Sequence, residues 1–204
     1  AVVFEEWNKG ELDSFLIEIT KNILRFRDED GKPLLDKILD VASQKGTGKW
    51  SVINAMELGM PLGLIATAVF ERSLSAQKEL RHQASHQFPR QHTQPIYNKA
   101  ELVKNIFSAL YASKLVSYAQ GFAVLQRASD TFGWQLDLAS IARMWRGGCI
   151  IRSIFLNDIA AAGSICRSKC CRIFKKYLNK TPIDFLNAYR LEVSTRLLTD
   201  TAMS

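Results

Sequence analysis

The chain has 204 residues, of which 47% are hydrophobic and 23% are charged, as expected for one globular domain or one domain with an appendage. No apolar run reaches the roughly 18–20 residues that cross a bilayer, which excludes a membrane protein. The first residues lack a signal peptide's basic start and apolar core, and no initiator Met precedes them, as in an excised segment. Four cysteines form neither a disulfide framework nor a zinc-binding pattern, so we predict reduced thiols and a cytoplasmic location.

The net charge of +7 is unevenly distributed. Residues 159–204 hold eight Lys or Arg residues against three acids, a net charge of +5, whereas residues 1–158 hold 19 against 17. A basic tail on a nearly neutral body favours a polyanionic partner for the tail alone.

Apolar residues recur at three- and four-residue steps along most of the chain, a spacing typical of helices. We expect loops at 28–33, 44–50 and 82–98, and helices over 7–26, 34–42, 60–81, 99–131, 138–145 and 149–158. No segment shows the alternation of a strand, and no glycine fingerprint of a dinucleotide-binding unit is present. The sequence therefore predicts an all-α fold.

The loop KGTGKW at 45–50 combines two lysines, a threonine hydroxyl and two glycines. Glycines allow backbone N–H groups to approach a phosphate, and lysines add charge, so the loop suits a phosphate. By itself the motif is also consistent with an ordinary turn bearing solvated lysines, and it lacks the spacing of a P-loop.

Residues 1–158 resemble the helical domain of the 6-phosphogluconate dehydrogenases. The resemblance rests on the stretches FEEWNKGELDSFLIEIT, DKILDVASQKGTGKWSVINAMELGMP, LIATAVFERSLSAQKELR, KLVSYAQGF and WRGGCIIRSIFLNDI. It implies oxidative decarboxylation of 6-phosphogluconate to ribulose 5-phosphate with NADP in the pentose phosphate pathway. It also implies that Lys45, Thr47 and Arg72 bind the substrate phosphate, although Arg72 alone reads as an exposed helix arginine beside Glu71.

The resemblance further implies parts that this stretch does not contain. The family's nucleotide domain and its acid–base residues would precede residue 1, so we predict no catalytic residue and no activity for the chain alone. His82, His86 and His92 are expected to be solvated in the loop at 82–98, and no metal site is predicted. A homodimer is implied, and without the family's C-terminal helices we expect apolar side chains to lie exposed at Leu110, Phe122, Ile150, Ile151, Ile154 and Phe155.

Residues 159–204 resemble a partial helix-turn-helix unit of the AraC-type regulators, through RIFKKYLNKTP and FLNAYRLE. Ser164 would cap a helix to about Leu178 with one apolar and one basic face, and Pro182 would open the next helix. The resemblance implies base contacts by Ser168, Cys171 and Arg172 and phosphate contacts by Arg167 and Lys175. A packed helix with a solvated basic face is the alternative. The expected organisation is thus a dehydrogenase fragment at 1–158 fused to a DNA-binding fragment at 159–204.

Overall fold

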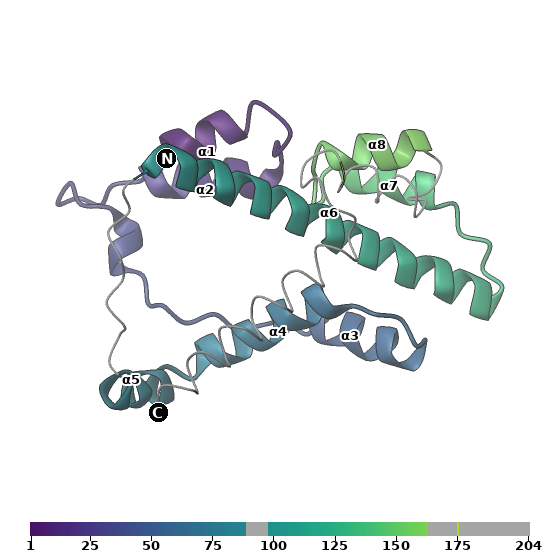
Figure 1. Cartoon of the computed structure of the whole chain (residues 1–204), viewed down its shortest axis with the longest axis horizontal. Coiled ribbons are helices and arrows are strands. Elements are labelled where there is room, and N and C mark those ends of the chain that lie inside the picture. Colours follow the sequence, from purple (N-terminus) through teal and green to yellow (C-terminus); the bar gives the residue numbers. More distant parts are fainter. Residues whose placement is uncertain (89–97, 163–174, 176–204) are drawn as a thin grey trace. The chain divides into compact units, whose positions relative to one another are not determined.

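The computed structural model describes residues 1–88, residues 98–162 and Lys175. The chain divides into two units, Ala1–Ser164 and Ile165–Ser204, and all described residues except Lys175 belong to the first. The elements of this first unit are helical (Figure 1): α1 Val2–Trp7, α2 Phe15–Arg25, the short 3-10 helix η1 Leu34–Lys37, α3 Thr47–Glu57, α4 Gly63–Ala76, α5 Lys78–Gln87, α6 Lys99–Phe132, α7 Leu138–Arg146 and α8 Phe155–Ala162. The described residues form no strand beyond two isolated bridges, which confirms the all-α prediction.

The predicted helix at 7–26 is wrong, because the chain turns between α1 and α2. Ser14 caps α2 by accepting a hydrogen bond from the Ile17 amide at 3.4 Å. Leu12 is fully buried, and it sits in the turn rather than on a helix. The apolar periodicity continued through the turn because the turn also contributes to the core.

Three other predicted helices have different bounds. The helix expected at 34–42 is the single turn η1, and the stretch expected at 60–81 is interrupted at Gln77, between α4 and α5. The helix expected at 149–158 begins only at Phe155. Gly148, with φ of 99°, starts the irregular stretch before it, and a backbone bridge joins Ser153 to Ser14.

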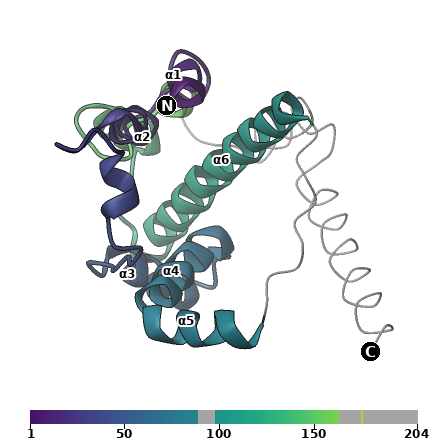
Figure 2. The ribbon, with the colours of Figure 1, turned by 90° about the vertical axis from the view of Figure 1, so that its left-hand side faces the viewer.

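The core is organised along α6, whose 34 residues match the expected helix at 99–131. Its Tyr111 ring packs against Phe155 of α8, with ring centroids 4.8 Å apart, and its Phe122 ring packs against Trp145 of α7 at 5.1 Å. The pair α7 and α8 is also in close contact (Figure 1), and Leu156 of α8 is fully buried. Figure 2 shows α6 as one long uninterrupted helix. Aromatic packing on α6 therefore connects it with both helices that follow.

Asp13, in the turn before α2, accepts two hydrogen bonds at its carbonyl from the segment before α8. The Ile154 amide donates to the Asp13 carbonyl at 3.0 Å, and the Ser153 hydroxyl donates to the same carbonyl at 3.3 Å. Lys114 of α6 donates to the Ser14 hydroxyl at 2.7 Å and to the Leu12 carbonyl at 3.3 Å. Residues about 100 positions apart are therefore connected through a single ammonium group.

Lys114 also lines a cavity of about 710 Å³ with largely apolar walls, formed with residues of α2, α3, α4 and α7. Burial lowers the pKa of Lys114 from 10.5 to about 8, and the Asp13 carboxylate opposes this shift only in part. No salt bridge to Lys114 is present among residues 1–88 and 98–162. Its protonated form is therefore held by neutral oxygen atoms.

Of the six apolar side chains expected to be exposed, two are buried, two are exposed, and Leu110 and Ile151 are half-buried. Phe122 and Phe155 were expected to be exposed, yet they are 2% and 4% exposed, because Phe122 packs against Trp145 of α7 and Phe155 packs against Tyr111 of α6. Ile150 and Ile154 are exposed, at 67% and 41%.

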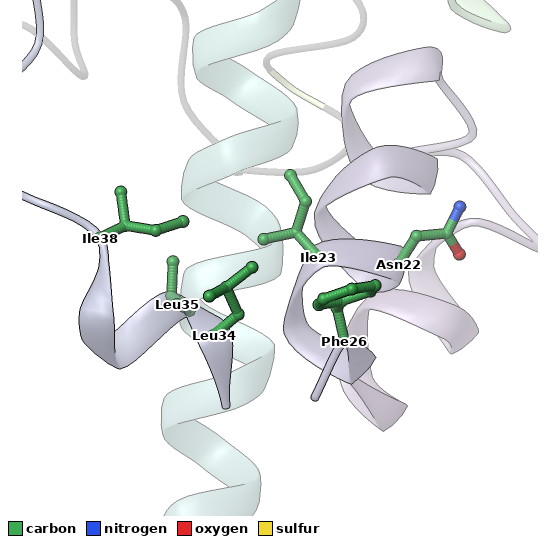
Figure 3. A pocket seen from close by; sticks show the side chains of 6 residues that line it. All are labelled: Asn22, Ile23, Phe26, Leu34, Leu35 and Ile38. Atoms are coloured by element: carbon green, nitrogen blue, oxygen red, sulfur yellow. The ribbon is translucent and has the colours of Figure 1, made fainter. Parts of the chain in front are cut away.

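A second apolar surface surrounds a shallow pocket of about 280 Å³ between α2 and η1. In Figure 3, Ile23 of α2 and Phe26, the residue after its end, lie opposite Leu34 and Leu35 of η1.

The predicted domain boundary between residues 158 and 159 falls within α8, which continues without interruption to Ala162. Ile159 is 4% exposed and belongs to the same buried core as Leu156. Within the described residues, none of the helices combines the length and apolarity required to cross a bilayer.

We expect Phe122→Ala to lower the free energy of unfolding by about 3–5 kcal/mol, because it leaves a cavity against Trp145. Phe70→Ala makes the same chemical change at a side chain that is 67% exposed, and should cost less than about 1 kcal/mol. Urea denaturation followed by far-UV circular dichroism measures both. Equal losses from the two variants would contradict the assignment of the core to α6.

The free energy of unfolding should rise with pH between about 8 and 10. The folded chain releases the Lys114 proton near pH 8, while the unfolded chain keeps it to an ordinary pKa of 10.5, so the unfolded state binds more protons in this window. The gain should be at most about 2 kcal/mol by pH 9.5. Denaturation curves of the parent and of Lys114→Met at three pH values test this, with Lys104→Met, at an exposed position of α6, as the control. If the free energy of unfolding changed with pH in the same way in the parent and in Lys114→Met, this prediction would be refuted.

Candidate phosphate-binding site

The predicted loop at 44–50 is half loop and half helix. Gly46 has φ of 100°, a conformation that favours glycine, and α3 begins at the next residue, Thr47. The Trp50 amide is the first to bond back into the helix, donating to the Gly46 carbonyl at 2.9 Å. The amides of Thr47, Gly48 and Lys49 therefore point out of the helix start, where backbone N–H groups and the helix dipole favour an anion.

The side chains predicted to bind phosphate surround this helix start. Lys45 is exposed one residue before Gly46, and Thr47 is exposed at the first helical position. Arg72 comes from α4, and its Nη2 donates a hydrogen bond to the carbonyl of Ser43, two residues before Lys45. The structure thus places Arg72 beside the segment that carries Lys45.

Gly48 has a role that the sequence pattern did not reveal. It lies inside the first turn of α3, and a Cβ atom there would be 2.8 Å from Cγ2 of Val69 on α4. Such a distance is too short for real carbon atoms, so only glycine allows α3 and α4 to approach this closely. One glycine of the motif therefore forms the helix start, and the other permits helix packing.

The site is cationic and its positive groups have no acidic partners nearby. Lys45, Lys49 and Arg72 form no salt bridge with any other residue in the described part of the chain. Two cationic side chains of different shape and a helix start together provide charge, directional donors and backbone amides. A doubly charged phosphate ester is the ligand that uses all three.

The contacts on either side of Ser43 were not anticipated. Ala42 donates from its amide to the Ser75 hydroxyl at 3.2 Å, and the Gln44 amide group donates to the Ser73 hydroxyl at 3.5 Å. Small hydroxyl residues in α4 carry no recognisable signal in a single sequence. The hydrogen bonds that Ser73 and Ser75 accept depend on the path of a segment about 30 residues earlier in the chain.

All three histidines were expected in a loop, but two of them lie on a helix. His82 and His86 are on α5, one helical turn apart, and their rings meet edge to face with centroids 4.6 Å apart. Both are exposed. His92 lies outside the described residues. No cluster of three metal-binding side chains occurs within the described ranges.

The residues predicted to bind DNA lie almost entirely outside the described part of the chain. Arg167, Ser168, Cys171 and Arg172 are not described, and Lys175 is described only as helical and exposed. Their proposed contacts with bases and phosphates stay predictions.

The helical unit is similar to a solved structure, that of Plasmodium falciparum 6-phosphogluconate dehydrogenase. The TM-score is 0.74 and the sequence identity 44%, covering 78% of this chain and 35% of that chain. That enzyme was studied in its apo form, with its cofactor NADP+ and with its substrate 6-phosphogluconate.

Curated relatives show the same similarity. The decarboxylating 6-phosphogluconate dehydrogenase of Schizosaccharomyces pombe is 55% identical over 162 residues, and that of Caenorhabditis elegans is 57% identical over 165 residues. Each alignment covers 79% of this chain, and the chain spans about a third of the relatives' length. A family model described as "6-phosphogluconate dehydrogenase, C-terminal domain" matches residues 1–203, which include most of the segment predicted to be a separate helix-turn-helix unit. The chain belongs to the family of the 6-phosphogluconate dehydrogenase C-terminal domain.

Proposed function

We propose that this chain forms the phosphate-binding part of the substrate site in a decarboxylating 6-phosphogluconate dehydrogenase. The observation that carries the proposal is the hydrogen bond from Arg72 to the Ser43 carbonyl, which brings a guanidinium beside the Lys45 loop and the start of α3. Relatives that are 55% and 57% identical carry the name of this enzyme. The whole protein would oxidise and decarboxylate 6-phosphogluconate to ribulose 5-phosphate.

The residues of the site would bind and orient the substrate. Arg72 would hold two phosphate oxygens with its planar fork, Lys45 would add a compact charge, and the amides from Thr47 onwards would complete the shell. Anchoring the phosphate at one end of the sugar acid fixes where the distant carbon atoms lie, which is the entropic part of catalysis. No described residue at this site is positioned as a general acid or base, so we assign none to proton transfer.

NADP is the proposed cofactor of the whole protein, as in the Plasmodium falciparum enzyme. The described residues do not fit this group, because they form no parallel sheet with a glycine-rich turn leading into a helix. We therefore propose no step of hydride transfer for them. A homodimer and a cytoplasmic location are further proposals that rest on the family resemblance.

The test is a titration of the 204-residue chain with 6-phosphogluconate, in which NMR shifts of the backbone amides report binding. Shifts should concentrate at Gly46, Thr47 and Gly48 and should be absent with gluconate, which has no phosphate. Lys45→Met or Arg72→Met should weaken binding about tenfold or more, because each removes a charge-assisted hydrogen bond worth roughly 1.5–3 kcal/mol.

Lys104→Met is the matched control, since it removes an exposed lysine of α6 without touching the site. It should leave the affinity for 6-phosphogluconate unchanged. An equal loss in Lys104→Met, or shifts spread evenly over surface lysines, would show non-specific attraction to positive charge and would reject the proposal.

Weak DNA binding by residues 159–204 is the second candidate, favoured by their net charge of +5. The affinity for duplex DNA should fall steeply between low and physiological salt. Arg172→Ala should change sequence preference, whereas Lys175→Ala should weaken all sequences alike, as fluorescence anisotropy with two unrelated duplexes would show. Equal losses from both variants on both duplexes would leave only a non-specific basic patch.

A further inference from the structure

The segment that leads into the phosphate site is attached to α4 and α5 by a set of side chains that do not themselves face the site. Arg81 of α5 is central to this attachment. Its Nη2 donates to the Asp40 carbonyl at 2.8 Å and to the Ser75 carbonyl at 3.2 Å, and its Nη1 lies 3.3 Å from the Asp40 carboxylate. One guanidinium thus joins the start of the segment to the end of α4.

The Asp40 carboxylate is held from a second direction by Lys78, whose Nζ lies 2.7 Å from it. Lys78 first and Arg81 second hold the pKa of the Asp40 carboxyl below its usual value, so the group is ionised at neutral pH. The neighbouring Ala42 amide is bound by the Ser75 hydroxyl. The Asp40 carbonyl, the Asp40 carboxylate and the Ala42 amide are therefore attached to the junction between α4 and α5.

The Asp40 side chain is 63% exposed, whereas the Arg81 side chain is half-buried, at 33% exposed. Its Nε is buried and has no hydrogen-bond partner within the described part of the chain. A buried donor without a partner costs free energy, and the two terminal nitrogens of the same guanidinium offset this cost with four hydrogen-bond contacts. A solvated arginine would turn its Nε to water.

The attachment lies immediately before the site. From Ala42 the chain has only Ser43 and Gln44 before Lys45, so a shift of the backbone at 40–42 passes directly into the loop. Arg72 is fixed on α4, and it reaches the same segment at Ser43. The relative position of Lys45 and Arg72 therefore depends on how firmly 40–44 lies along α4.

We propose that Arg81, together with Ser75, is a positioning element of the anion site, which fixes the 40–44 segment so that Lys45 and Arg72 converge on one phosphate. This inference rests on the proposed function of that site. Arg81 does not touch the ligand. It acts through the Asp40 carbonyl and the backbone of the segment.

The test compares Arg81→Gln, Arg81→Lys and Ser75→Ala in the 204-residue chain, with 6-phosphogluconate as the probe. Arg81→Gln should weaken binding roughly tenfold and reduce the ligand-induced shifts at Gly46 and Thr47. Arg81→Lys should restore part of the affinity, since it keeps one charged donor. Ser75→Ala is the milder variant that keeps the ion pair, and it should weaken binding by a few-fold even where Arg81→Gln fails to fold.

Arg152→Gln is the matched control. Arg152 also forms a part-buried ion pair, to Glu18 at 2.7 Å, but it lies before α8 rather than near the site. A purely structural role for Arg81 predicts that both Gln variants lower the melting temperature and neither changes the affinity. That result, with the parent binding and Lys45→Met not binding, would overturn the positioning role and leave the proposed function intact. A parent chain without 6-phosphogluconate binding would overturn both.

Discussion

The backbone of the segment from Asp40 to Gly48 is held in position because side chains of α4 and α5 form hydrogen bonds with its main chain. It has no strand or long helix of its own before Thr47, so its carbonyl and amide groups depend on side chains of the later helices. Arg72 and Arg81 donate hydrogen bonds to two of its carbonyls, and one of its amides donates to the Ser75 hydroxyl. The place of the proposed phosphate-binding loop is therefore set by residues about 30–40 positions further along the chain.

Close packing of α3 against α4 completes this arrangement. The absence of a side chain at Gly48 lets the helices approach until Val69 fills the space that a Cβ would occupy. The same closeness brings the amino end of α3 to the helix that carries Arg72. A site of this kind needs little specialised chemistry, because a helix start, an ammonium and a guanidinium already provide the donors that a phosphate requires.

The sequence correctly predicted the helical class and the long helix α6, and it named three candidate site residues whose role in phosphate binding stays a prediction. It did not predict that α1 and α2 are separate, because Leu12 in the turn is buried and so preserves the helical spacing. It could not predict the partners of Ser43 or Asp40 either. Those contacts depend on tertiary packing between segments whose residues have no local pattern linking them. The buried state of Phe122 and Phe155 was missed for the same reason, since each packs against a ring of another helix, Trp145 of α7 and Tyr111 of α6.

The most direct test of this account is the structure of the chain with 6-phosphogluconate bound. The account predicts phosphate oxygens at roughly 2.7–3.2 Å from the Thr47 amide, Lys45 Nζ and the Arg72 guanidinium at the same time. It also predicts that Arg72 keeps its place against α4 while the ligand binds. A phosphate group bound at another surface, or bound by Lys45 with Arg72 turned away, would contradict the claim that the two helices build one anion site.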